Sequence, residues 1–169
     1  PTLVLLALRW LLFCLEFGAG LIKLRGDPCW RDLTCLEFHH ETQPMPNRFS
    51  WWFHRLPAPL HRVEVLANHG TQLVVPWFLF APQPVAGAAA VVIIVTQGWL
   101  VLSGNFSWLN VITMVLAVAA LDLGGSPPEL TAPGWHQGVV AAVAALVAVL
   151  SWWPVRNMLG RRQAMNASL

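Results

Sequence analysis

The chain has 169 residues, of which 56% are hydrophobic and only 11% carry charge. A soluble domain usually has roughly 25% charged residues, so this composition excludes an ordinary water-soluble globule and predicts a membrane protein. The formal net charge is +2, and the arginines cluster beside apolar runs instead of lining one basic face. We therefore expect no nucleic-acid partner.

Five apolar stretches approach the roughly 20 residues that a helix needs to cross a bilayer core. They cover approximately residues 3–24, 65–80, 85–103, 106–121 and 135–153. Clusters of Pro, Gly and Ser separate the last four stretches and predict tight antiparallel hairpins. The expected fold is an all-α, multi-pass transmembrane bundle in contact with the lipid bilayer. Since the sequence begins without Met, we expect a fragment of a longer membrane domain.

Residues 25–62 form the longest polar segment. Aromatic and leucine residues alternate there with Arg, His and Glu, which predicts short helices at the membrane interface. This segment and the C-terminal tail hold nearly all Lys and Arg residues, with four predicted crossings between them, so the positive-inside rule places both on the cytoplasmic side. A disulfide between Cys29 and Cys35 would instead require an oxidising compartment.

The first predicted span carries three charged residues at intervals of seven: Arg9, Glu16 and Lys23. This spacing places them on one side of a helix. An ionisable group at the bilayer centre costs roughly 3 kcal/mol, so the stripe must face other helices or water. Two interpretations stay open. Either the stripe is a polar site inside the bundle, or Arg9 and Lys23 reach opposite surfaces and only Glu16 is buried.

Further polar residues lie at or within the next three predicted spans: Glu64, Asn68, His69, Gln72, Gln97 and Asn110. Glu64, Asn68 and Gln72 follow one another at intervals of four, so they also form one stripe. These residues either join helices through hydrogen bonds of about 1 kcal/mol each, or line a polar chamber between the first and second predicted helices that binds a headgroup, a peptide segment or an ion. The pattern favours the first interpretation.

Glu37 and His40 have the Glu-x-x-His spacing of di-metal helical bundles, and Glu41 lies one turn beyond Glu37. Such a site needs a second motif and further carboxylates, which we do not find, so no metal site is predicted. No Ser-His-acid pattern or Gly-rich phosphate loop can be identified either. The sequence therefore predicts neither catalytic residues nor a cofactor.

One group of residues at the end of the first predicted span and after it forms a distinctive motif: Lys23, Arg25, Gly26, Asp27, Pro28, Cys29, Trp30, Glu41, Thr42, Gln43 and Pro44. This motif resembles the core of the lipase maturation factor family, and the likeness covers most of residues 9–121. The resemblance implies a membrane-bound chaperone that helps secreted lipases fold and assemble, without a catalytic residue. It implies the endoplasmic reticulum membrane in a eukaryote and the plasma membrane in a bacterium.

Some positions depart from the family's pattern. Glu16 stands where the family usually has Met, and Gln72 stands where an acid is common, so the stripe with Glu16 is not expected to be a shared site. The alternative function is an integral membrane enzyme with an active site built from the polar stripes, similar to membrane carboxylases.

Overall fold

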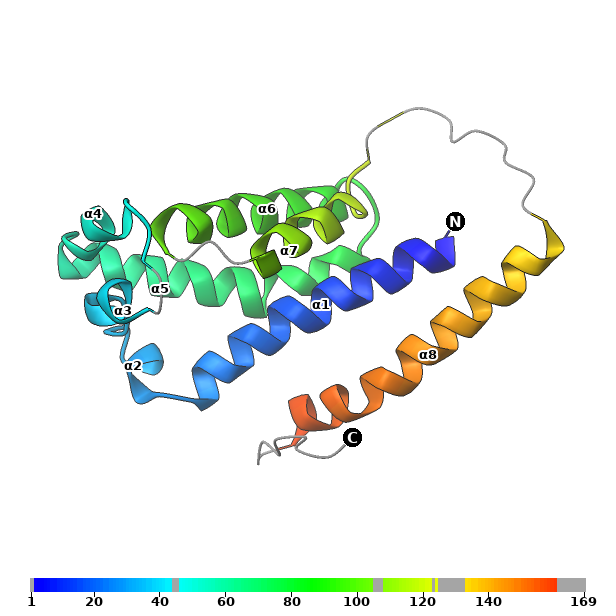
Figure 1. Cartoon of the computed structure of the whole chain (residues 1–169), viewed down its shortest axis with the longest axis horizontal. Coiled ribbons are helices and arrows are strands. Elements are labelled where there is room, and N and C mark those ends of the chain that lie inside the picture. Colours follow the sequence, from blue (N-terminus) through cyan, green and yellow to red (C-terminus); the bar gives the residue numbers. More distant parts are fainter. Residues whose placement is uncertain (1, 44–45, 105–107, 123, 125–132, 161–169) are drawn as a thin grey trace. The chain divides into compact units, whose positions relative to one another are not determined.

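The structure is a computed structural model that describes residues 2–43, 46–104, 108–122, 124 and 133–160. All regular elements in these residues are helical (Figure 1), which confirms the predicted all-α class. In chain order they are α1 (Thr2–Arg25), α2 (Pro28–Arg31), α3 (Leu36–Thr42), α4 (Ser50–His54), α5 (Ala58–Leu73), the 3-10 helix η1 (Val75–Phe80), α6 (Val85–Ser103), α7 (Trp108–Val118) and α8 (Gly134–Leu159).

Three of the described helices, α1, α6 and α8, are long and apolar enough to cross a membrane, and α7 is a shorter apolar helix. The expected count of five spans is therefore not confirmed. The stretch 65–80, expected as one span, is divided, because α5 ends at Leu73 and η1 follows. Pro76 lies in the first turn of η1, and its ring and missing N–H oppose continuation of the α-helix.

The chain divides into two compact units, Arg9–Asp122 and a second unit made of Pro1–Leu8 and Leu123–Leu169. In the first unit, α6 packs against α7 and η1. The buried core there consists of Leu12, Leu79, Ala89, Ala90, Ile93, Ala117 and Ala120. Four of these seven residues are alanines, and small side chains let helices approach closely inside a membrane. In the second unit, α8 has no buried residue among those described.

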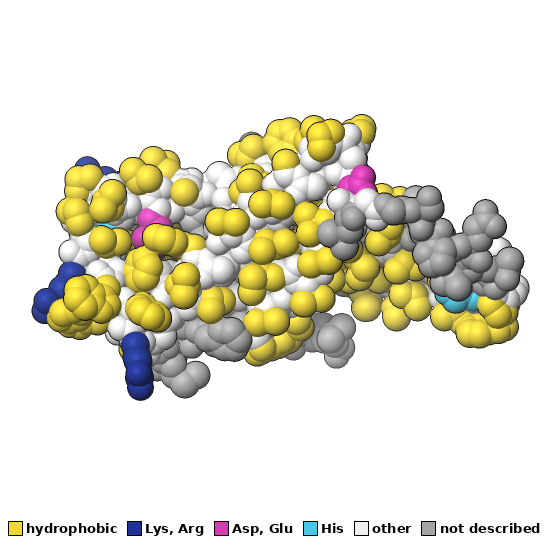
Figure 2. All heavy atoms as spheres, turned by 90° about the horizontal axis from the view of Figure 1, so that it is seen from above, with side chains coloured by type: hydrophobic (Ala, Val, Ile, Leu, Met, Phe, Trp, Pro, Cys, Tyr) yellow, Lys and Arg dark blue, Asp and Glu magenta, His cyan; other side chains and the backbone are white. Residues whose placement is uncertain are grey.

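The short helices α2, α3 and α4 lie together at one end of the Arg9–Asp122 unit (Figure 1). We call residues 26–57 the short-helix segment. It is shorter than the predicted polar segment, since α5 already begins at Ala58 with Pro59 in its first turn, a favoured place for proline. On the face drawn in Figure 2, Lys and Arg side chains gather at this end. Much of the remaining surface of the unit is apolar, with Val95 65% exposed and Val115 64% exposed.

Helix α1 contacts the end of α5 at Gly20, which is buried. A Cβ atom at this position would lie 2.7 Å from Leu73 Cδ2 and 3.1 Å from Gln72 Cβ. Both distances are too short for carbon atoms, so only glycine fits between the two helices without displacing Leu73 and Gln72.

We therefore expect Gly20→Ala to lower the free energy of unfolding of the full-length protein in detergent by about 1–3 kcal/mol, the usual effect of overpacking. The matched control is Gly98→Ala on α6, where no described heavy atom lies within 4 Å of the added Cβ. That change should be neutral or stabilise by up to about 1 kcal/mol through helix propensity. Thermal unfolding followed by circular dichroism measures both, and equal midpoints for the two variants would contradict the close contact at Gly20.

Candidate functional site

The motif contains the residues at which α1 ends and, directly after them, those at which α2 begins. Gly26 N–H donates to Ile22 O at 2.8 Å, and a Cβ on Gly26 would lie only 2.8 Å from the same oxygen. Glycine is thus required at the end of α1. Asp27 then caps α2, since its carboxylate accepts a hydrogen bond from Cys29 N–H at 2.9 Å, and Pro28 occupies the first turn.

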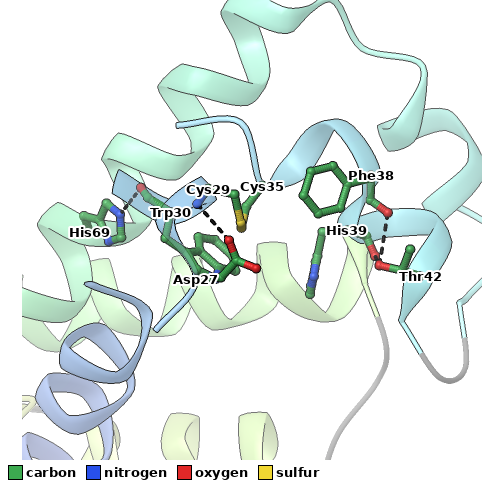
Figure 3. Close-up of a disulfide and its surroundings, with 8 residues drawn as sticks. All are labelled: Asp27, Cys29, Trp30, Cys35, Phe38, His39, Thr42 and His69. Atoms are coloured by element: carbon green, nitrogen blue, oxygen red, sulfur yellow. Dashed lines mark hydrogen bonds between the residues drawn. A yellow bond between two sulfur atoms is a disulfide. The ribbon is translucent and has the colours of Figure 1, made fainter. Parts of the chain in front are cut away.

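A disulfide joins Cys29 of α2 to Cys35, the residue before α3, with a Cα–Cα distance of 4.7 Å (Figure 3). The chain reverses between them at Leu33, which has a positive φ of 61°. By the chain-entropy estimate, a disulfide that closes so short a loop contributes about 2 kcal/mol. It fixes α2 relative to the start of α3.

Trp30 of α2 lies between side chains from three other helices. Lys23 Nζ of α1 lies 4.9 Å from the centroid of the Trp30 ring, within cation–π range. His39 of α3 stacks edgewise on the same ring, and His69 Nε2 of α5 donates to Trp30 O at 3.0 Å (Figure 3). The motif tryptophan therefore connects α1, α3 and α5.

The two polar stripes predicted on α1 and α5 meet at Lys23, whose Nζ donates to Asn68 Oδ1 at 2.6 Å. Lys23 thus points to α5, which favours the interior interpretation of this residue. The Arg9 side chain likewise points toward another helix, since its Nη1 donates a hydrogen bond to Leu79 O of η1 at 3.3 Å. Gln72 is buried near Gly20 on the same face of α5.

Glu16 forms the centre of a second polar connection. It is 2% exposed, and its Oε1 accepts from Gln97 Nε2 of α6 at 2.5 Å. Gln97 Oε1 accepts in turn from Asn110 Nδ2 of α7 at 2.6 Å. We call these three residues the Glu16 network. It joins α1, α6 and α7 by side-chain hydrogen bonds within otherwise apolar helices.

A cavity of about 330 Å³ lies where the motif and the polar stripes come together. Its polar lining includes Lys23, Trp30, His40, Gln43, Glu64, Asn68 and Asn110. Glu64 is held there by Trp99 of α6, whose Nε1–H donates to Glu64 Oε1 at 2.7 Å. Residues predicted separately as motif and as intramembrane polar groups thus share one cavity.

The second half of the motif fixes α3 against α4. Glu41 Oε1 pairs with His54 Nε2 at 2.6 Å, and Gln43 Nε2 donates to Ser50 Oγ at 3.1 Å. Thr42 Oγ1 donates to Phe38 O within α3 at 3.2 Å (Figure 3). Arg25 is exposed at the end of α1, and Pro44 lies outside the described residues. Glu41 and Thr42 therefore shape the short-helix segment without lining the cavity, whereas Gln43 lines it.

Sequence reasoning missed one group of side chains. His40 of α3 lies beside His61 and Glu64 of α5, and the two histidines are 3% and 2% exposed. Burial lowers the pKa of His40, and the neighbouring His61 lowers it further. Burial also lowers the pKa of His39. In the sequence, the only indication of this cluster was that His61 and Glu64 are three residues apart, a spacing that places both on the same side of a helix. Glu37 and Glu41, considered with His40 in the sequence, are exposed.

A family model described as the lipase maturation factor transmembrane domain matches residues 1–124. The chain belongs to the lipase maturation factor family. The match covers the motif, the cavity and the Glu16 network, so all of these lie in the family's transmembrane domain.

Named members of the lipase maturation factor family resemble nearly the whole chain. Bovine Lipase maturation factor 1 is 40% identical over 99% of it, and the human protein of that name is 50% identical over 98%. Human Lipase maturation factor 2 is 35% identical over 82%. The chain spans only about a third of the length of the first two relatives, 35% and 34%. No solved structure matches it.

The Glu16 network leads to a double-mutant test of stability. Gln97→Leu leaves the buried Glu16 and Asn110 without their shared partner, so we expect a loss of about 1–3 kcal/mol in the free energy of unfolding. Glu16→Leu should also destabilise the protein, because it leaves the Gln97 side-chain N–H without its hydrogen-bond acceptor. The combined variant should lose at least about 0.5 kcal/mol less than the sum of the single variants. Denaturant unfolding in detergent measures all three, and strict additivity would contradict a direct contact.

Proposed function

We propose that this chain forms the membrane region of a maturation factor that assists the folding and assembly of secreted lipases. The main support is its 40% and 50% identity, over nearly its whole length, to proteins named Lipase maturation factor 1. The relatives reported above are all maturation factors, and they give no support to the alternative of a membrane enzyme.

The short-helix segment is the surface that we propose to contact the client. It carries large exposed aromatic side chains: Phe49 is 55%, Trp51 50% and Trp52 66% exposed. Arg55 lies over the Trp51 ring at 3.8 Å and keeps one face of that ring covered. Exposed tryptophans beside Arg are typical of binding surfaces and of membrane interfaces. The disulfide and the Glu41–His54 pair hold this surface in shape without the client.

We further propose that the short-helix segment faces an oxidising compartment, the endoplasmic reticulum lumen in a eukaryotic host or the outer side of the plasma membrane in a bacterium. The Cys29–Cys35 disulfide supports this orientation. By the positive-inside rule, the distribution of Lys and Arg favours the opposite side of the membrane. That rule, however, applies to all loops of a protein taken together. A client that is secreted lies on the oxidising side, so the disulfide agrees with the proposed role.

The function is tested by expressing the full-length protein in cells that lack their own lipase maturation factor, together with a secreted lipase. Lipase activity per unit of secreted lipase protein should rise. Trp52→Ala should reduce that rise if the short-helix segment contacts the client. The control Trp135→Ala removes an equally exposed tryptophan, 69% against 66%, from α8. Unchanged lipase activity with the unmodified protein would refute the proposed function.

The orientation is tested on sealed endoplasmic reticulum vesicles. After reduction with a membrane-permeant thiol, an impermeant maleimide should label Cys29 and Cys35 only when the vesicles are opened by detergent, since the lumen is otherwise inaccessible. Peptide mass spectrometry identifies the labelled residues, and a Cys14→Ser background removes the remaining described free thiol. Labelling in sealed vesicles would place the segment in the cytoplasm.

A further inference from the structure

Three side chains of the types that bind metal ions converge at the edge of the cavity. His61 and Glu64 lie one turn apart on α5, and His40 approaches them from α3. One donor atom from each lies within 4.8 Å of the other two. The cluster therefore combines two imidazole nitrogens with one carboxylate oxygen, drawn from two different helices.

The donor atoms of this cluster lack hydrogen-bond partners in the described part of the chain. They are His40 Nε2, both ring nitrogens of His61, and Glu64 Oε2. The two histidines are more than nine-tenths buried. Leaving a buried polar group unpaired costs about 1–3 kcal/mol, so several such groups side by side indicate that the cluster is completed by something besides protein.

Outer contacts orient two of the three side chains. The carbonyl oxygen of Ser103 can only accept, so His40 Nδ1 carries the proton in their 3.2 Å hydrogen bond. In the neutral ring, Nε2 then has a free lone pair toward the cluster. Glu64 Oε1 accepts from Trp99 Nε1–H, which leaves Oε2 toward the histidines. Hydrogen bonds of this kind fix the ring and carboxylate orientation in protein metal sites.

We propose that His40, His61 and Glu64 bind one divalent transition-metal ion, for which zinc is the best fit. Two histidines and one carboxylate are a common zinc ligand set, whereas calcium and magnesium prefer oxygen ligands alone. Donor atoms around a tetrahedral zinc ion lie roughly 3.3 Å apart, so small side-chain rotations close the cluster around the ion. The cavity, lined by His40 and Glu64, leaves room for a water molecule as fourth ligand.

The bound ion would connect α3 to α5. The disulfide fixes the start of α3, and Gln43 fixes its end through Ser50. A metal at His40 would add a third attachment between them. The proposal does not depend on the client, so it stands or fails separately from the proposed function.

The test uses the full-length protein purified in detergent, treated with a chelator, incubated with zinc chloride and desalted. Bound zinc is measured by mass spectrometry of the element, and affinity by competition with a chromophoric chelator. Replacing zinc by cobalt should give the visible absorption of a tetrahedral site. Glu64→Gln should abolish that spectrum and reduce the zinc bound by about one ion per chain, because an amide is a poor zinc ligand.

Further variants separate binding from folding. His61→Ala should lose the same ion, and Trp99→Phe, which keeps all three ligands, should weaken zinc binding by about tenfold or more. The matched control His136→Ala removes an exposed histidine of α8 and should bind as the unmodified protein does. If His61→Ala does not fold, Glu64→Gln and Trp99→Phe decide. Equal zinc content and affinity in Glu64→Gln and the unmodified protein would overturn the proposal.

Discussion

The hydrogen bond between the buried Glu16 carboxyl group and Gln97 is the polar contact that links α1 to α6 within the bundle. In an apolar environment a carboxyl group without a partner is very unfavourable, so this hydrogen bond favours the rotation of α1 that turns Glu16 toward Gln97 of α6. Asn110 extends the same constraint to α7. Apolar helices have no comparable preference for one rotation inside lipid, since lipid tails are as apolar as leucine. The polar side chains therefore add to the packed core a preference for one alignment of these helices.

The rotation of α1 set by Glu16 also places Lys23, two turns further along the helix. Lys23 then meets Asn68 of α5 and the ring of Trp30. Through Trp30 the constraint passes to α2 and, by way of the disulfide, to α3. Residues deep in the bundle and residues of the exposed short-helix segment thus belong to one connected arrangement. This explains physically why the polar residues of α1 and the motif that follows it form a single structural unit.

The sequence predicted helix bounds best where the length of an apolar stretch matched the positions of the helix-breaking residues beside it. Residues 85–103 correspond to α6, which ends directly before Gly104. The stretch 65–80 was expected as one span because hydropathy continues through Val74, whereas Pro76 changes the local geometry. Polar stripes were recognised on α1 and α5, but their partners were not, because spacing along one helix says nothing about its rotation against another. The proximity of His40 to His61 was not predicted for the same reason, since the two residues are 21 positions apart in the sequence.

The disulfide between Cys29 and Cys35 also connects the shape of the short-helix segment to the redox conditions around it. On the reducing side of a membrane the two thiols would not be joined, and the turn between α2 and α3 would be held by backbone hydrogen bonds such as that from Thr34 N–H to Cys29 O. Oxidation thus adds a covalent link to the short-helix segment. Under the proposed function, this segment would form its disulfide by the same thiol chemistry that secreted proteins meet during their own folding.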